Sequence, residues 1–206
     1  MKYNHFIFDV DGTLLNTEKT GILSLQQTVR EITGKEMEYE ALYDYFGLPS
    51  AKAAEALGAS DAKLFAETWE THFQELMYLV TVFPGVEEAL AAVKAAGARL
   101  GIVTSRNRFE LNYDPTLRKW ASIFDLMVCS EDTLRHKPDP DPILYYIEKM
   151  GADPRKCIYI GDTTHDWQCA AGAGVDFALA DWNGRGKRGI PALIHVTSSK
   201  NIMDLI

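Results

Sequence analysis

The sequence predicts an α/β fold in which a parallel sheet carries helices on both faces and an all-α helical bundle is inserted near the start of the chain. Short apolar runs alternate with helix-length amphipathic segments over residues 83–182, a pattern typical of strands joined by crossover helices. Residues 17–81 instead show helical periodicity throughout, which indicates a helical insertion. Polar side chains follow three apolar runs directly, at Asp9, Thr104 and Asp162, as expected where the carboxyl ends of parallel strands form a binding crevice.

The first predicted strand covers residues 4–10, where phenylalanine, isoleucine and valine leave little polar alternation and so indicate burial on both faces. Asn16 or Thr17 can cap the helix that follows, and apolar residues recur along it at helical spacing until Gly34. Because glycine is common just past a helix end, we expect this helix to end there.

Three more helices are expected in the insertion: two short ones near residues 38–46 and 50–57, and a long amphipathic one that begins at Asp61. A four-helix block of this size can form a small core of its own. We therefore expect a helical domain over residues 17–82. The core domain is expected to comprise the rest of the chain, residues 1–16 and 83–206.

The remaining chain is expected to alternate between helices and strands. Expected helices cover residues 86–97, 115–120, 142–150 and 164–173, with a final helix near residue 200. Expected strands cover residues 99–104, 126–129, 157–160, 177–180 and 194–196. Because crossover connections give parallel strands, the carboxyl ends of these strands should meet at one edge of the sheet.

The composition argues against a nucleic-acid binder or a membrane protein. The 206-residue chain has a net charge of -8, whereas nucleic-acid binders need a basic surface. No apolar run is long enough to span a bilayer, and the strand at the N-terminus leaves no room for a signal peptide. The three cysteines, Cys129, Cys157 and Cys169, lack the spacing of a disulfide framework or a zinc site. We therefore expect a cytoplasmic protein without nucleic-acid or membrane partners.

Two carboxylates, Asp9 and Asp11, follow the first strand and precede Gly12. Both can reach one cavity, and with Asp162 and Asp166 that cavity would hold four negative charges, which a hard divalent cation would balance. Oxygen-only ligands favour Mg²⁺, and Gly12 permits a turn that points backbone amides at an anion. The same residues also fit a polar turn with capping aspartates. A calcium loop is disfavoured by the buried strand and by the lack of a closing glutamate.

A hydroxyl pair and a lysine follow later strands. Thr104 and Ser105 could hold a phosphate oxygen, although serine and threonine also end many strands as helix caps. Lys137 lies beside three prolines between residues 138 and 142, which stiffen the backbone. A point positive charge suits a phosphate or a phosphorylated carboxylate, and the alternative is a solvated surface lysine.

Asp162 and Asp166 lie at the start of a predicted helix, after the strand at residues 157–160. Asp162 at the strand end could bind a metal directly, and Asp166 could orient Lys137 or a metal-bound water. Helix capping would explain one of these aspartates but not the second.

Together these segments resemble the four motifs of the haloacid dehalogenase superfamily, and most closely its phosphoglycolate phosphatase-like phosphatases. In order, they are Asp9-x-Asp11-Gly12-Thr13, a strand that ends in Thr104, Lys137-Pro138, and Gly161-Asp162-x-x-x-Asp166. Each motif alone is modest, but the ordered set is specific, and a helical insertion separates the first two motifs. The resemblance implies a Rossmann-like core with a helical cap, and a Mg²⁺-dependent phosphatase that acts on a small phosphorylated metabolite.

The resemblance also implies a role for each motif residue. Asp9 would attack phosphorus to form an aspartyl-phosphate, and Asp11 would protonate the leaving oxygen and then activate water. Asp9, the Asp11 backbone carbonyl and Asp162 would bind Mg²⁺. Asp166 would support the metal shell and Lys137.

The phosphoryl group would be held by Gly12, Thr104, Ser105 and Lys137. The chain departs from many relatives after Thr104, where Ser105-Arg106-Asn107-Arg108 stands in place of an immediate asparagine or lysine. We expect the side chains of Arg106 and Arg108 on the surface rather than near the substrate.

Substrate choice would come from the helical cap. The turn at residues 46–50 matches the place where related caps carry a specificity loop, so Leu48 and Ser50 could face the leaving group; the alternative is an ordinary helix–helix turn. Phosphoglycolate-like and pyrophosphate-like substrates fit the resemblance. A phosphosugar mutase of the same superfamily and a catalytically idle binding or regulatory module remain alternatives. We expect a monomer or homodimer.

Overall fold

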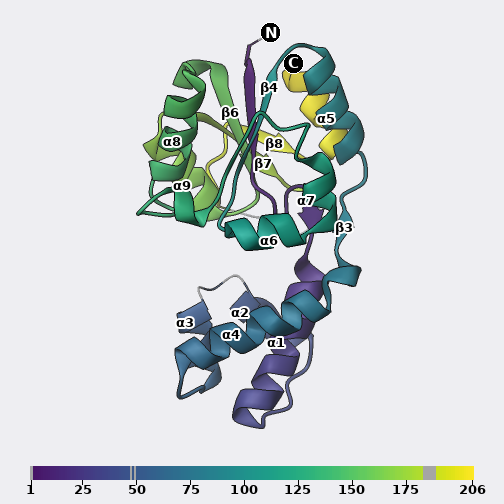
Figure 1. Cartoon of the computed structure of the whole chain (residues 1–206), viewed down its shortest axis with the longest axis vertical. Helices are drawn as coiled ribbons and strands as arrows, with labels where there is room; N and C mark the ends of the chain where they lie inside the picture. Colours follow the sequence, from purple (N-terminus) through teal and green to yellow (C-terminus); the bar gives the residue numbers. More distant parts are fainter. Residues whose placement is uncertain (1, 47, 49, 183–188) are drawn as a thin grey trace. The chain divides into compact units, whose positions relative to one another are not determined.

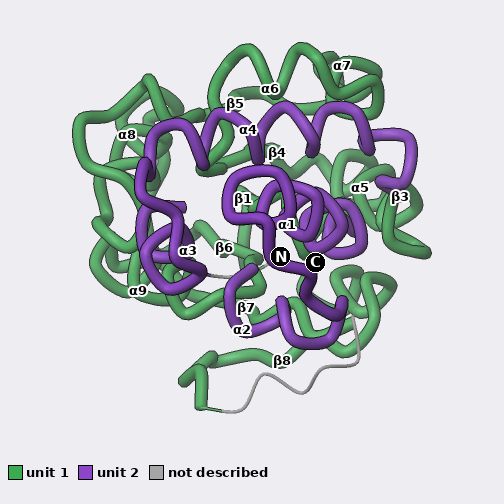
Figure 2. The backbone as a smooth tube through the Cα atoms, turned by 90° about the horizontal axis from the view of Figure 1, so that it is seen from below, with its two compact units in different colours: residues 1–15, 82–206 green, residues 16–81 purple. Residues whose placement is uncertain are grey.

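The computed structural model describes residues 2–46, 48, 50–182 and 189–206. The chain folds into two compact units, one formed by residues 1–15 and 82–206 and the other by residues 16–81 (Figure 2). The second unit is therefore one continuous segment that interrupts the first. Within the described ranges, every helix is too short or too polar to cross a bilayer.

The first unit is built on a six-stranded parallel sheet. Its strands are β1 (His5–Phe8), β4 (Arg99–Val103), β5 (Leu126–Val128), β6 (Cys157–Gly161), β7 (Asp176–Ala180) and β8 (Ile194–Val196). They lie in the order β5-β4-β1-β6-β7-β8, so the chain extends the sheet first on one side of β1 and then, from β6 onward, on the other. The strand order therefore reverses between β1 and β6, where a parallel sheet places its binding crevice.

Helices cover both faces of this sheet (Figure 1). They are α5 (Val86–Ala95), α6 (Arg108–Tyr113), α7 (Pro115–Trp120), α8 (Asp141–Met150) and α9 (Thr164–Gly172). On one face, Ile7 of β1 shares a buried core with Ile143 of α8 and Cys169 of α9. Helix α5 lies on the opposite side of the strands in Figure 1 and packs with the 3-10 helix Ser199–Leu205. All four residues of β1 are buried, as predicted for a strand covered on both faces.

The second unit is helical. Its α-helices are α1 (Glu18–Thr33), α2 (Tyr43–Phe46), α3 (Ser50–Leu57) and α4 (Ala62–Glu75). Its core consists of buried apolar side chains, namely Ile22, Leu25, Val29, Leu42, Ala53, Ala54, Leu57 and Phe65. The side chain of Asp61 caps α4, and Gly34 ends α1 with a φ of 68°, as predicted. Two short strands, β2 (Leu15–Asn16) and β3 (Thr81–Val82), pair at the points where the chain passes between the units.

The predicted parallel α/β sheet is confirmed, and the differences are local. The first strand ends at Phe8, because the chain then turns and the carbonyl of Val10 accepts from the N–H of Leu14 at 2.9 Å. The sequence prediction misses α6, although Asn107 and Glu110 form a reciprocal capping box whose spacing signals a helix start. The final helix is of the 3-10 type.

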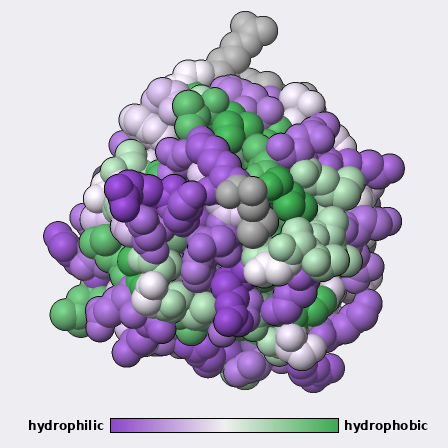
Figure 3. All heavy atoms as spheres, turned by 90° about the horizontal axis from the view of Figure 1, so that it is seen from above, coloured by the Kyte–Doolittle hydropathy of each residue, from purple (hydrophilic) through white to green (hydrophobic). Residues whose placement is uncertain are grey.

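The surface in Figure 3 carries mainly hydrophilic residues, with apolar side chains in smaller groups among them. The three cysteines are all buried and free.

Candidate active site

Asp9 lies directly beyond β1, and its backbone N–H donates to the carbonyl of Ile160 in β6 at 2.9 Å. Its side chain is buried, with the residue 5% exposed. Gly12, in the turn that follows, has a φ of 81°, a left-handed conformation that favours glycine. A Cβ at Gly12 would also collide with the carboxylate of Asp162. The first motif is therefore held against the carboxyl end of β6, at the reversal of strand order.

Lys137 reaches the same point from the loop before α8. Its ammonium donates to Asp9 Oδ1 at 2.6 Å and to Asp166 Oδ1 at 2.7 Å, and it lies 3.2 Å from the hydroxyl of Tyr159. The side chain is only 7% exposed, which excludes a solvated surface lysine. The Lys137–Pro138 peptide bond is cis.

Asp166 anchors that lysine from the first turn of α9. Its Oδ2 accepts from the hydroxyl of Thr163 at 2.6 Å and from the Thr163 N–H at 3.0 Å, as half of a capping box. Its Oδ1 accepts from Lys137 and lies 3.1 Å from the Tyr159 hydroxyl. A Cβ at Gly161 would lie 2.6 Å from the Cβ of Asp166, so glycine is required there for this close approach. Asp166 is thus fully buried with both oxygens bound.

Burial and nearby charges determine the electrostatics of this cluster. Burial raises the pKa of Asp9 well above its ordinary value, although Lys137 opposes this. Three neighbouring carboxylates raise the pKa of Asp9 further, those of Asp166, Asp162 and Asp11. Burial alone would lower the pKa of Lys137, but Asp166 and Asp9 raise it above its ordinary value. Burial alone would raise the pKa of Asp166, but Lys137 lowers it. The lysine is therefore charged and is paired with two buried carboxylates, those of Asp9 and Asp166.

The carboxylates of Asp9, Asp162 and Asp166 fit a metal site. One oxygen from each lies within 4.8 Å of the others, and all three residues are buried. An oxygen-only donor set suits a hard divalent cation such as Mg²⁺. The side chain of Asp11 is not part of this group in the described chain, and the metal contact expected from its backbone carbonyl stays a prediction.

Thr104 lies directly beyond β4, the strand that pairs with β1. Its N–H donates to the carbonyl of Val128 at 3.1 Å, and its hydroxyl accepts from the N–H of Arg106 at 3.2 Å. Thr104 is buried and Ser105 is exposed. The phosphate-binding roles of Gly12, Thr104 and Ser105 stay predictions.

The surface placement expected for Arg106 is wrong. The residue is 8% exposed, and its Nε and Nη2 donate to the two carboxylate oxygens of Asp11 at 2.8 and 2.7 Å. Its Nη1 donates to Asp114 Oδ2 at 3.0 Å. Burial alone would lower the pKa of Arg106, but Asp11 and Asp114 raise it. Arg108, by contrast, has a 48% exposed side chain paired with Asp132, as expected.

The two positions proposed to face the leaving group belong to the helical unit. Leu48 is 37% exposed, and Ser50 is partly buried as the first residue of α3. Gly47 and Pro49 lie outside the described residues. The role of Leu48 and Ser50 in specificity stays a prediction.

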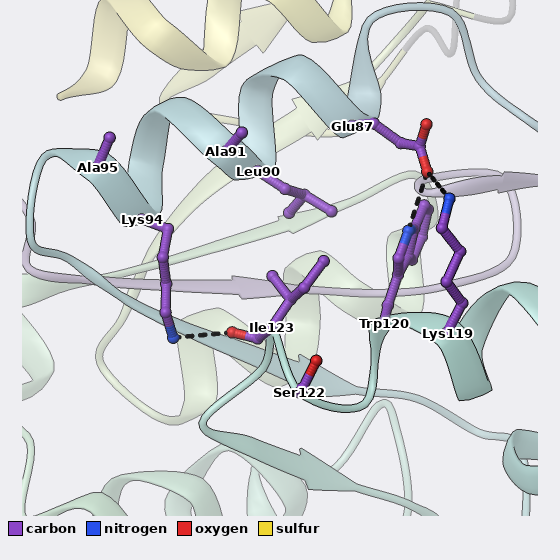
Figure 4. A pocket seen from close by; sticks show the side chains of 9 residues that line it. All are labelled: Glu87, Leu90, Ala91, Lys94, Ala95, Lys119, Trp120, Ser122 and Ile123. Carbon is purple, nitrogen blue, oxygen red and sulfur yellow. Dashed lines mark hydrogen bonds and ion pairs between the residues drawn. The ribbon is translucent and has the colours of Figure 1, made fainter.

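A pocket of about 630 Å³ lies elsewhere on the first unit, between α5 and the end of α7 (Figure 4). Its lining residues are Glu87, Leu90, Ala91, Lys94, Ala95, Lys119, Trp120, Ser122 and Ile123. In Figure 4, Glu87 accepts from both Lys119 and the indole of Trp120, each at 3.1 Å. The motif residues contribute nothing to this lining, so the pocket is separate from the carboxylate cluster.

Comparison with known proteins identifies the family. The model of the haloacid dehalogenase-like hydrolase family matches residues 6–180. The chain belongs to this family. The match extends from β1 to β7 and so includes all four motifs of this haloacid dehalogenase-like hydrolase.

Curated relatives of this hydrolase carry phosphatase names. The pyrophosphatase PpaX of Bacillus velezensis is 28% identical over 207 residues, which cover 94% of this chain and 96% of the relative. The phosphoglycolate phosphatase of Nitrosospira multiformis is 30% identical over 180 residues, which cover 82% of this chain and 78% of the relative. The family and these relatives together support a phosphatase.

A solved structure supports the fold over the whole chain. The crystal structure of a candidate phosphoglycolate phosphatase from Lactobacillus plantarum has a TM-score of 0.86 and 27% identity, with complete coverage of both chains. The resemblance read from the four motifs is therefore confirmed at the level of family and fold.

Proposed function

We propose that this chain is a Mg²⁺-dependent phosphatase that hydrolyses a small phosphorylated metabolite through an aspartyl-phosphate intermediate. The main support is that Asp9, Lys137, Asp162 and Asp166, from three separate segments, converge at the carboxyl ends of β1 and β6. A nucleophilic carboxylate, a fixed cation and further carboxylates for a metal are the groups that in-line phosphoryl transfer requires.

In the first half-reaction, a carboxylate oxygen of Asp9 attacks phosphorus while the bond from phosphorus to the leaving oxygen breaks. Asp11 gives that leaving oxygen a proton. Asp9 attacks as the ionised carboxylate, although its surroundings raise its pKa. The ammonium of Lys137, 2.6 Å away, favours the ionised form and also attracts the incoming phosphoryl group.

In the second half-reaction, water attacks the phosphorus of the aspartyl-phosphate and gives its proton to Asp11. The acyl–phosphate bond breaks, inorganic phosphate leaves and the Asp9 carboxylate is restored. Gly12, Thr104, Ser105 and Lys137 hold the phosphoryl oxygens in both steps. Bound Mg²⁺, held by Asp9, the Asp11 backbone carbonyl and Asp162, would supply positive charge to neutralise those oxygens.

We propose pyrophosphate-like and phosphoglycolate-like compounds as the first substrates to test, because relatives of the chain are named for such activities. In this proposal the helical unit, residues 16–81, acts as a cap, and Leu48 and Ser50 contact the leaving group. Changing these two residues should then alter selectivity among substrates more than it alters turnover of a small generic ester. An equal loss on all substrates would count against this role.

The decisive experiment is a phosphate-release screen of the purified chain with Mg²⁺, on phosphomonoesters, sugar phosphates and pyrophosphate. Asp9→Asn should lose turnover and still bind substrate, because it keeps the shape but removes the nucleophile. Asp204→Asn, at an exposed position near the C-terminus, is the matched control and should keep full activity. Full activity in Asp9→Asn would refute the nucleophile assignment. Conversion of a sugar phosphate to its isomer without phosphate release would favour the mutase.

A further inference from the structure

Arg106 connects two carboxylates beside the first motif. Its guanidinium bonds to both oxygens of Asp11 on one edge and to Asp114 on the other. The side chains of Arg106 and Asp114 are 8% and 1% exposed, whereas that of Asp11 is 38% exposed. Asp114, the least exposed of the three side chains, therefore binds Arg106 on the side away from Asp11, and Asp11 is the side chain that solvent reaches most easily.

The guanidinium is fixed from two directions. Asp114 Oδ1 accepts from the N–H groups of Thr116 and Leu117 at 2.9 and 3.1 Å, which leaves Oδ2 for Arg106. The backbone of Arg106 is also tied down, because its carbonyl accepts from the N–H of Ser130 at 3.0 Å. Neither Asp114 nor the backbone of Arg106 can shift without breaking bonds in α7 or after β5.

We propose that Arg106 is a positioning residue that holds the Asp11 carboxyl in a single orientation for proton transfer, with Asp114 as its anchor. This inference rests on the acid/base role of Asp11 in the proposed function. The planar guanidinium bonds to both carboxylate oxygens at once and so fixes the rotation of the carboxyl plane. A lysine would supply one point charge and leave that rotation free.

Arg106 holds the Asp11 carboxyl through both of its oxygens. A carboxylate offers about four lone-pair sites on its two oxygens, and Arg106 occupies one on each oxygen. Positioning matters because a displacement of about 1 Å can cost about 10²-fold in rate.

The test compares Arg106→Lys and Asp114→Asn with the wild-type chain on two esters. Para-nitrophenyl phosphate has a leaving group that needs little protonation, whereas an alkyl phosphate depends on the acid. We expect Arg106→Lys to lower kcat about 10²-fold on the alkyl ester and less than about tenfold on the nitrophenyl ester, with KM nearly unchanged. Asp114→Asn keeps the acceptor for the α7 amides but loses the one for Arg106, so it should show the same pattern with a smaller loss.

Thermal unfolding of both variants separates positioning from misfolding. Equal losses on the two esters in folded variants, or full activity in Arg106→Lys, would overturn the inference and leave the proposed function intact. A crystal structure of Arg106→Lys should show the Asp11 side chain rotated or in several orientations, and an unchanged Asp11 would also overturn it. If the wild-type chain released phosphate from neither these esters nor the wider screen, the proposed function would fail and this inference with it.

Discussion

Lys137 provides the sharpest test of the electrostatics, because one nearly covered ammonium faces two buried carboxylates. In Lys137→Met the side chain keeps a similar length but loses its charge, so Asp9 and Asp166 each lose a bond of 2.6 to 2.7 Å. Removing one partner from a buried ion pair typically costs about 3–5 kcal/mol. Asp166 retains its hydrogen bonds from Thr163. We therefore expect the free energy of unfolding to fall by about 3 kcal/mol at neutral pH, near the lower end of that range.

The sign of the pH dependence follows from Asp9. Burial already raises its pKa above the ordinary value while Lys137 opposes the rise, so the variant should have a still higher pKa for this carboxyl. A carboxyl whose folded pKa lies above its unfolded value of about 3.9 destabilises the fold as pH rises between those two values. The loss in free energy of unfolding that Lys137→Met causes should therefore be smaller at about pH 5 than at about pH 7.5, since Asp9 is more fully protonated at the lower pH.

Urea unfolding at these two pH values measures the effect, and thermal unfolding should show a fall of roughly 10 °C. Lys156→Met is the matched control, because Lys156 is exposed and its loss should change the free energy of unfolding by less than about 0.5 kcal/mol. A Lys137→Met variant as stable as the wild type, or a deficit that does not change with pH, would refute this account of the cluster.

Three further predictions concern single positions at the site. Gly12→Ala should destabilise the chain by more than the cost of about 1–2 kcal/mol for a left-handed alanine. Gly97→Ala is its control, since Gly97 has a φ of 83° and no neighbour within 4 Å; equal losses in urea unfolding would exclude a collision with Asp162. The lowered pKa of Asp166 adds stability above about pH 3.9 that is lost as pH falls through the folded value. The free energy of unfolding of Asp166→Asn should therefore fall less than that of the wild type between about pH 6 and pH 3. An equal fall in the two proteins would contradict this. Finally, Mg²⁺ should raise the Tm of the wild-type chain but not of Asp162→Asn, and an equal rise in both would exclude Asp162 as a ligand.

Much of the fold could be predicted because its signals are local. The strand before Asp9 is a continuous apolar run, and Gly34 and Asp61 mark a helix end and a helix start within a few residues of the elements they control. Asp9, Thr104 and Asp162 were predictable for a related reason. Parallel strands bring their carboxyl ends to one edge, so a polar residue that follows a buried strand is placed by the topology alone.

Arg106 could not be placed in this way. Its partner Asp11 is 95 residues distant in the sequence, and a cation after Thr104 fits a surface turn equally well. The helix beginning at Pro115 was predicted, and an aspartate before it is a common cap. That signal, however, accounts for only one oxygen of Asp114. The second oxygen, which holds Arg106, depends on how the loops after β4 and β5 pack.

The two carboxylates of the first motif are held by the same kind of arrangement. Asp9 is bound by Lys137, which Asp166 anchors from the start of α9; Asp11 is bound by Arg106, which Asp114 anchors from the start of α7. The cations differ in a way that suits the proposed roles. A nucleophile must be free to bond to phosphorus, and the ammonium contacts only one of its oxygens. An acid/base must keep its direction through two proton transfers, and the guanidinium contacts both oxygens. The lysine at one position and the arginine at the other therefore agree with the roles proposed for the two carboxylates.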